Sequence, residues 1–303
     1  MLNSVKPSFG VAGFPPNFFK SHFGKKRENI FEWLNNIGLN WIELQNTYGV
    51  KMKDEQAHLY SDLAKEHHIG VSIHAPYYIT LASKEKEVRD RSKERILQCF
   101  DLAMKLNSKH IIFHPGHFPG TDERSRREGI QMLIEGLLSL ERVLPADDIF
   151  LYPETAGKKA QLGSIEEIIE ICSHVKFACP CIDVAHVHAF RGGTLTTPAD
   201  VVSLLDLIEE RLGATSLHKT HFHMYPIEVD HTGEKKHKAF SDRIKNQQFS
   251  LLGDNPADRY FPLAEHFAQA IATKGLTPSI ICEARDSQDT GALLIKKHYE
   301  KMQ

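Results

Sequence analysis

The stretch Phe177-Ala-Cys-Pro-Cys-Ile-Asp-Val-Ala-His-Val-His-Ala-Phe190 joins a short apolar run to Asp183 and, three residues later, to His186. An acid at the tip of a strand with a histidine just past it is a typical way to hold a metal ion. The alternative is a strand that ends in a capping aspartate beside a packing histidine. The same plan, an apolar run followed by polar residues, recurs along the chain.

Short runs rich in β-forming residues alternate with helical patterns from end to end. Strands are predicted at 8–12, 40–45, 70–74, 109–114, 148–154, 176–183, 216–223 and 279–283. Helices are predicted at 28–37, 54–67, 84–106, 123–144, 164–175, 198–212, 262–273 and 291–301, with a capping box formed by Ser164 and Glu167. Eight strands, each followed by a helix and without a linker, predict an α/β fold, a (β/α)8 TIM barrel that forms a single domain over residues 1–303.

A doubly wound two-domain enzyme is the alternative fold. The sequence has no GxGxxG after the first predicted strand and no GxxxxGK[ST] motif. It therefore supports neither a dinucleotide site nor a P-loop, and the barrel is preferred.

Composition sets further limits. With 303 residues and a formal net charge of −2, the chain does not look like a general nucleic-acid coat protein, although a local basic groove is compatible with this charge. The first residues have no apolar core for a signal peptide and no run approaches a membrane span, so we expect a cytoplasmic protein without membrane contact. The five cysteines have no framework spacing and are expected to be reduced. Histidine is unusually frequent, at 18 residues, which suggests metal binding or proton transfer.

The ends of the predicted strands carry the polar residues. In this barrel, catalytic groups lie at the C-terminal ends of the strands. The third to eighth strands end in His74, His114, Glu154, Asp183, the pair His221 and His223, and Glu283, and His186 follows the sixth. Any one of these residues could be a cap or a packing residue, but together they must converge on one cavity at the barrel mouth. Carboxylates gathered there would repel one another unless cations lie between them.

The number and type of these residues indicate several metal ions. Nitrogen and oxygen ligands without thiolate favour zinc or manganese, or iron. When one histidine of the seventh strand is counted, Glu234 and His237, in the long polar insertion after that strand, bring the set to nine. Nine ligands are too many for one ion and suit a cluster of two or three, which is a known solution for the hydrolysis of phosphate esters.

Five separated motifs carry a family resemblance. They are Ser72-Ile-His-Ala-Pro-Tyr-Tyr-Ile-Thr-Leu-Ala-Ser83, Ile112-Phe-His-Pro-Gly116, Pro153-Glu-Thr-Ala-Gly157 with Leu162-Gly163, Cys181-Ile-Asp-Val-Ala-His186 and Ile281-Cys-Glu283. In their order and their positions on predicted strands, they resemble the motifs of the endonuclease IV family, the AP endonuclease family 2 repair enzymes, which have a xylose isomerase-like barrel.

The resemblance implies a trinuclear site of Zn²⁺, with Mn²⁺ as an alternative at one position. The implied ligand sets are His74, His114 and Glu154 for one ion; Glu154, Asp183, His223 and Glu283 for a second, with Glu154 bridging; and His186, Glu234 and His237 for the third. A metal-bridging hydroxide would attack the phosphate 5′ to an abasic site in double-stranded DNA and leave a 3′-hydroxyl. Glu154 and Glu283 would also orient that hydroxide as catalytic residues.

Two positions depart from the family pattern. Bacterial members carry Asp-x-His in the insertion, whereas this chain has Gly233-Glu-Lys-Lys-His237, which adds a methylene and one residue. The seventh strand of the family gives one ligand, but this chain offers His221 and His223. We prefer His223 because its spacing to Glu234 resembles that in archaeal-type members of the family, and His221 is the alternative.

Three further residues are expected to contact DNA. Many family members place an arginine that intrudes into DNA in the loop after the second strand, but this loop reads Gln45-Asn-Thr-Tyr-Gly49. Tyr48 could stack on a base instead. Tyr77 matches the family tyrosine that inserts beside the lesion, and Lys158 is expected to contact a phosphate, as is the basic run 235–238. The implied partner is double-stranded DNA that contains abasic sites, bound by a monomer.

A sugar isomerase or epimerase of the xylose isomerase-like barrel group is the alternative function. Such enzymes use one divalent ion, whose four ligands would be Glu154, Asp183, His223 and Glu283. They have no need of His74, His114, His186, Glu234 and His237, and the presence of all five favours the nuclease. A metal- or DNA-binding module without activity would not require a cluster in a barrel mouth.

Overall fold

A computed structural model describes residues 6–118, 120–144, 148–244 and 258–303. The first five residues, on which the expected absence of a signal peptide partly rests, lie outside the described residues. So does 245–257, which is part of the long polar insertion after the seventh barrel strand.

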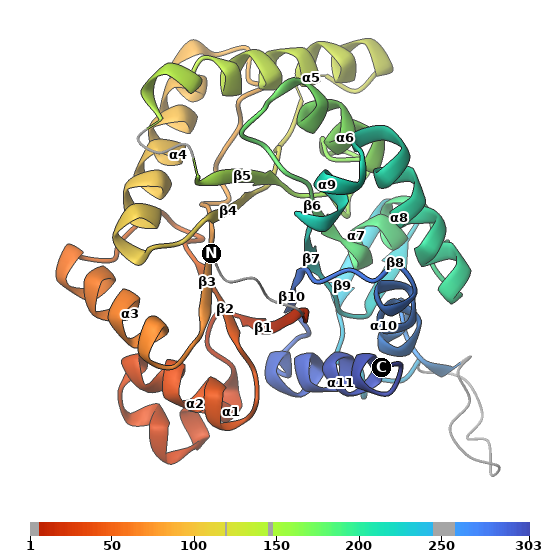
Figure 1. Ribbon diagram of the computed structural model, residues 1–303. Coiled ribbons are helices and arrows are strands. Elements are labelled where there is room, and N and C mark those ends of the chain that lie inside the picture. Colours follow the sequence, from red (N-terminus) through yellow and green to blue (C-terminus); the bar gives the residue numbers. More distant parts are fainter. Residues whose placement is uncertain (1–5, 119, 145–147, 245–257) are drawn as a thin grey trace.

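Eight parallel strands form the wall of a barrel, with helices around the outside (Figure 1). The strands are β1 (Ser8–Ala12), β2 (Trp41–Gln45), β3 (Gly70–His74), β4 (His110–Phe113), β5 (Phe150–Pro153), β6 (Cys181–Asp183), β7 (His221–His223) and β10 (Ser279–Cys282). Their order in the sheet is β5-β4-β3-β2-β1-β10-β7-β6. Parallel bridges from Leu151 to Ala178 and from Glu154 to Cys181 close the barrel between β5 and β6. The expected (β/α)8 barrel is confirmed.

The outer helices follow the strands in the expected alternation. They are α2 (Ile30–Asn36), α3 (Asp54–Glu66), α4 (Lys86–Leu106), α5 (Glu123–Leu138), α6 (Ile165–His174), α8 (Pro198–Leu212), α10 (Ala264–Thr273) and α11 (Gln288–Glu300). Shorter helices are α1 (Pro16–Lys20), α7 (Val184–Phe190), α9 (Ala214–His218) and three 3-10 turns at His22–Lys25, Arg27–Asn29 and Glu141–Val143. Two of the long helices begin with a capping box, Ser164 with Glu167 as expected and Thr197 with Asp200.

Strand alternation places the core and the site on opposite sides of the wall. On β2, Ile42 and Leu44 belong to the large apolar cluster, which also holds Phe222 of β7 and Phe267 of α10, with ring centroids 5.5 Å apart. Glu43, between Ile42 and Leu44, points the other way because successive side chains of a strand alternate. The barrel interior therefore receives polar side chains that the wall screens from the helices.

The sixth and seventh strands are shorter than predicted. The prediction 176–183 yields a strand only at Cys181–Asp183; Phe177 and Cys179 still bond to Leu151, and Pro180, which has no N–H, separates this bridge from the strand. The prediction 216–223 was wrong at its start: Gly213, with φ of 84°, ends α8, and α9 then occupies Ala214–His218. Both strands still end at the residues that the sequence indicated.

Three other segments differ from expectation. The predicted helix 123–144 ends at Leu138, where the backbone tightens to an i→i+3 bond from Leu140 N to Leu137 O of 2.8 Å. Helix α7 occupies the stretch after Asp183, which we expected to be a loop. The described part of the polar insertion contains an antiparallel hairpin of β8 (Ile227–Asp230) and β9 (Gly233–His237).

The described ranges contain no helix that is both long enough and apolar enough to cross a membrane. All five cysteines are free, as expected.

Candidate metal centre

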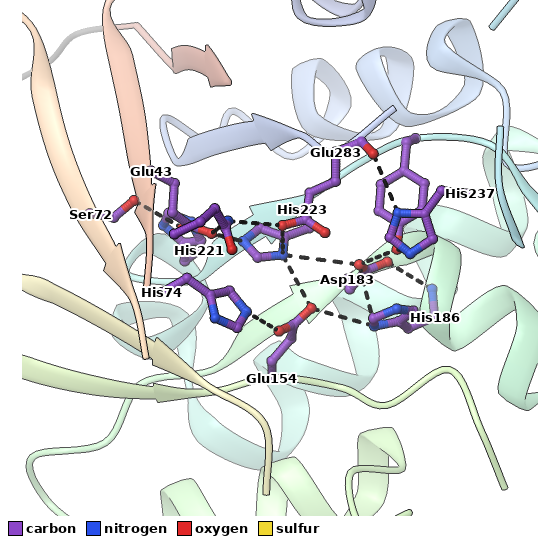
Figure 2. Close-up of polar contacts among 12 residues, drawn as sticks. Glu43, Ser72, His74, Glu154, Asp183, His186, His221, His223, His237 and Glu283 are labelled. Carbon is purple, nitrogen blue, oxygen red and sulfur yellow. Dashed lines mark hydrogen bonds and ion pairs between the residues drawn. The ribbon is translucent and has the colours of Figure 1, made fainter. Parts of the chain in front are cut away.

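The strand ends meet at one place (Figure 2). His74, Asp183 and His223 are the last residues of β3, β6 and β7, and Glu154 and Glu283 directly follow β5 and β10. His114 directly follows β4 and contacts Glu154. Because the strands are parallel, all six side chains lie at the same end of the barrel. The structure thus brings together the residues that the strand ends predicted, although their role as ligands stays a prediction.

Glu154 lies at the centre of the cluster and is 1 % exposed. Its Oε2 is 3.2 Å from His74 Nε2 and 3.3 Å from His114 Nδ1. Its Oε1 is 3.2 Å from His223 Nδ1 and 3.4 Å from His186 Nδ1. One carboxylate therefore faces two pairs of histidines, each pair with a different oxygen.

The potential ligand atoms form groups in which all atoms lie within 4.8 Å of one another. Three of the groups are His74, His114 and Glu154; Asp183, His223 and Glu283; and His186, Glu234 and His237. The first and third groups match the ligand sets expected from the sequence, and the second matches its expected set except for the bridging Glu154, which is absent from that group. A fourth group, Glu154, Asp183 and His186, links these sets.

Backbone carbonyls fix which nitrogen of several histidines faces the cluster. His74 Nδ1 is 2.9 Å from Ala75 O, and His186 Nδ1 is 2.8 Å from Thr155 O. A carbonyl oxygen only accepts, so both Nδ1 atoms carry a hydrogen, and in the neutral form of each ring, which binds metal, Nε2 offers the lone pair. His74 Nε2 then faces Glu154, and His186 Nε2 lies 3.4 Å from Glu234 Oε2.

Asp183 has two roles that divide between its oxygens. Oδ1 accepts a hydrogen bond of 2.7 Å from the backbone N–H of His186 and caps helix α7. Oδ2 accepts a hydrogen bond of 2.8 Å from Tyr225 Oη and lies 4.0 Å from His223 Nδ1. The capping interpretation and the cluster interpretation of this aspartate are therefore compatible.

The hairpin β8–β9 places Glu234 and His237 at the cluster, although one more residue separates them than in the Asp-x-His pattern. Residues three apart on a regular strand face opposite sides, but the register shifts between Glu228 and Val229 and leaves Lys235 as an extra residue. This bulge returns both side chains to one side, where His237 Nε2 lies 3.2 Å from Glu234 Oε1.

Gly157 is required for the hairpin to approach. Its carbonyl accepts a hydrogen bond of 2.8 Å from Glu234 N. A Cβ at this position would lie 2.7 Å from side-chain atoms of both Glu234 and His186, far closer than van der Waals contact allows. The glycine of the Pro153–Gly157 motif therefore makes room for the third ligand group.

Protons on histidines balance the buried carboxylates. Burial would raise the pKa of Glu154, but the charges and hydrogen bonds of the surrounding histidines hold it well below its usual value. Burial raises the pKa of Asp183 to about 6, although His186 opposes the shift. Burial opposes protonation of His74 and His186, but carboxylate neighbours raise their pKa values to about 9 and about 10. Metal ions could replace this positive charge.

The donor chemistry fits metal ions. Glu154 and Asp183 are buried carboxylates whose oxygens converge with imidazole lone pairs, an arrangement that needs positive charge between them. None of the grouped residues is a cysteine. Nitrogen and oxygen donors without sulfur suit Zn²⁺ or Mn²⁺, as expected.

Sequence reasoning missed Glu43. It is fully buried on β2 and contacts His221 and His223. His221 pairs with Cys181 and Ser279, at the starts of their strands, and so lies deeper in the barrel than His223, which pairs with Asp183. Alternation around the apolar Ile42 and Leu44 was the available signal, because an acid between two core residues must point into the barrel.

The residues expected to contact DNA lie around the mouth. Tyr77 and Lys158 line a pocket of about 170 Å³ together with His114, His186, Glu234, His237 and Glu283. Tyr48, 74 % exposed, lines a separate hollow of about 310 Å³ beside Gln45. In the run 235–238, Lys235 and Lys238 both pair with Glu228.

Comparisons with known proteins place the chain in a family. A relative of 29 % identity, spanning 99 % of this chain and 100 % of its own length, is an uncharacterised protein of Methanocaldococcus jannaschii. A probable endonuclease 4 of Aquifex aeolicus is 26 % identical over 67 % of this chain and 75 % of its own length.

Solved structures with this fold include both kinds of enzyme that the sequence suggested. Endonuclease IV from Thermus thermophilus matches with a TM-score of 0.66 at 16 % identity, over 98 % of this chain and 99 % of that one. A D-tagatose 3-epimerase-like protein matches with a TM-score of 0.66 at 15 % identity, over 97 % of each chain. The sequence model of the xylose isomerase-like TIM barrel family matches residues 31–301. The chain belongs to this family.

Proposed function

We propose that this protein is a metal-dependent endonuclease that hydrolyses the phosphodiester 5′ to an abasic site in double-stranded DNA. The observation that carries the proposal is the presence of three ligand groups joined through Glu154, which is more than one ion can use. The motif order and the relatives named probable endonuclease 4 support the same function. The cluster would hold three ions, of Zn²⁺ or with Mn²⁺ at one site.

The reaction would take place in the pocket between Tyr77, Lys158 and the ligand groups. When bound, the ions would stabilise charge on the phosphate and lower the pKa of a water. Glu154 holds the ligand groups in register because each of its oxygens faces a different pair of histidines. Glu283 lines the pocket, and its carboxylate would accept a hydrogen bond from the attacking water and orient it.

Residues at the rim would hold the DNA. Lys158 is exposed and would pair with a backbone phosphate. Tyr77 is 49 % exposed, and its ring would stack in the gap that a missing base leaves. Tyr48 would stack on a neighbouring base in place of the arginine that this loop lacks.

A single-metal sugar epimerase is the second candidate. Glu154, Asp183, His223 and Glu283 alone would make a four-ligand site, and epimerases share the fold. In that case His74, His114, His186, Glu234 and His237 would bind no metal, and two of the glutamates would move protons of the sugar.

One experiment separates the two candidates. The metal-loaded protein is offered a duplex with one tetrahydrofuran abasic analogue, an undamaged duplex of the same sequence, and a ketohexose. We expect a single nick 5′ to the analogue with a 3′-hydroxyl end, no cut in the undamaged duplex and no change in the sugar. Epimerised sugar without nicking would overturn the proposal.

A further inference from the structure

Glu43 is a buried carboxylate that the proposed reaction does not use. It is fully buried inside the barrel, where side chains are ordinarily apolar. An isolated carboxylate in such a place is costly unless hydrogen bonds satisfy it. The groups that hydrogen-bond to the Glu43 carboxylate therefore indicate what this residue does in the barrel.

Among the described residues, four side chains hydrogen-bond to the Glu43 carboxylate, and Figure 2 shows Ser72, His221 and His223 beside it. Ser72 Oγ donates to Oε2 at 2.9 Å, and Gln45 Nε2 donates to Oε1 at 3.2 Å. His221 Nε2 lies 3.1 Å from Oε2. His223 Nε2 lies 3.2 Å from Oε1 and forms its hydrogen bond with Oε2 at 3.4 Å, so it is within reach of both oxygens. Trp41 Nε1 in turn donates a hydrogen bond of 3.0 Å to Ser72 Oγ.

The contact with His223 decides which nitrogen of that ring is available to the cluster. If Nε2 donates its hydrogen to Glu43, Nδ1 carries the lone pair. Nδ1 is the atom that faces Glu154 at 3.2 Å and Glu283 at 3.7 Å. His74 and His186 obtain the same control from the backbone carbonyls of Ala75 and Thr155, whereas His223 obtains it from a carboxylate.

We propose that Glu43 is a positioning residue of the metal centre, which accepts the Nε2–H of His223 and thereby aims its Nδ1 lone pair at the site shared with Asp183 and Glu283. Ser72 and His221 hold Glu43 in place. The inference rests on the proposed role of His223 as a ligand. It does not depend on the substrate, because the nuclease and the epimerase alternatives both use this ligand.

The competing interpretation is an additional ion held by Glu43, His221 and His223, whose ligand atoms also lie within 4.8 Å of one another. In that case His223 would bind ions through both ring nitrogens. Ser72, Gln45, His221 and His223 together match the roughly four acceptor sites of a carboxylate, which favours the hydrogen-bonded arrangement.

The first test uses the unaltered protein loaded with Zn²⁺. Long-range nitrogen–proton NMR of the imidazole rings, with His223 assigned by its absence in His223→Gln, reports the tautomer of each histidine. We expect His223 to carry its hydrogen on Nε2 and to bind zinc through Nδ1. A hydrogen on Nδ1, or zinc bound to both nitrogens, would overturn the proposal.

The second test compares Glu43→Gln with Glu166→Gln, an exposed glutamate of α6 that pairs with Arg191. An amide can turn its NH2 toward Nε2 of His223, which would move the ring hydrogen to Nδ1. We expect Glu43→Gln to weaken one zinc ion by roughly 10- to 100-fold in chelator competition, while the others keep the parent's affinity. Unchanged affinity for all ions, or loss of one ion beyond those in the three ligand groups, would refute the positioning role. Should this variant fail to fold, the tautomer measurement decides alone.

Discussion

Replacing Glu154 by glutamine tests the centre of the cluster. In this variant a metal ion should lose a ligand whichever way the new amide is oriented. Oε1 faces His223 and His186, and Oε2 faces His74 and His114. In Glu154→Gln one of these positions becomes an NH2 group, which cannot bind a metal ion, so at least one ion loses a ligand in either orientation.

The expected loss of activity is large. Removing a single charge-stabilising donor from an active site costs about 10²–10³ in rate, and Glu154 serves two ligand groups. We therefore expect single-turnover nicking of the tetrahydrofuran duplex to fall by at least about 10³-fold, or about 4 kcal/mol of transition-state stabilisation. Bound zinc, measured by elemental analysis, should fall below the parent's value.

A matched control distinguishes this effect from a general loss of fold. Glu166→Gln makes the same chemical change on the surface of α6 and should nick like the parent. Circular dichroism of both variants should match the parent at room temperature. If Glu154→Gln binds as much zinc as the parent and nicks within about tenfold of its rate, the assignment of Glu154 as the shared ligand is wrong.

Three other changes probe separate parts of the site. Gly157→Ala places a Cβ 2.7 Å from Glu234 and His186. The ion held by His186, Glu234 and His237 should therefore be lost, while the ions of the other two ligand groups remain. Elemental analysis measures this loss, and a full zinc content would contradict the packing argument. Metal binding at pH 7 should release protons, because His74 and His186, with pKa values of about 9 and about 10, are charged without metal and must be neutral as ligands. The affinity for metal should therefore rise with pH. Calorimetry in buffers of different ionisation enthalpy should detect the released protons, and binding heats that do not depend on the buffer would exclude their release. Tyr77→Ala should weaken binding of the abasic duplex by about 5- to 150-fold, since base–aromatic stacking contributes about 1–3 kcal/mol. Its zinc content should be unchanged. Unchanged affinity in a gel-shift titration would remove Tyr77 from the DNA interface.

The ends of the strands were the part of the site that the sequence could predict. In a parallel barrel every strand ends at the same face, so a polar residue after each apolar run is sufficient to locate the cluster. This reasoning found His74, Asp183 and Glu283 without knowledge of their contacts. The segment boundaries were less accurate where one residue interrupts the local pattern, as Pro180 does directly before β6.

The depth of a residue in the barrel could not be read from the sequence. His221 and His223 are two apart and both point inward, so alternation does not distinguish them; their strand register places only His223 beside Asp183. Glu43 lies in the middle of β2, not at its end, and was overlooked for that reason. The bulge at Lys235, which brings Glu234 and His237 to one side, depends on pairing with β8 and has no local signature. That the chain forms one domain and acts as a cytoplasmic monomer stays a prediction.

Anomalous diffraction from crystals grown with zinc tests the central claim most directly. Data collected on both sides of the zinc absorption edge give the number and position of bound ions. We predict three peaks: one between His74, His114 and Glu154, one between Asp183, His223 and Glu283, and one between His186, Glu234 and His237. A single peak between Glu154, Asp183, His223 and Glu283 would contradict the trinuclear site and favour the epimerase.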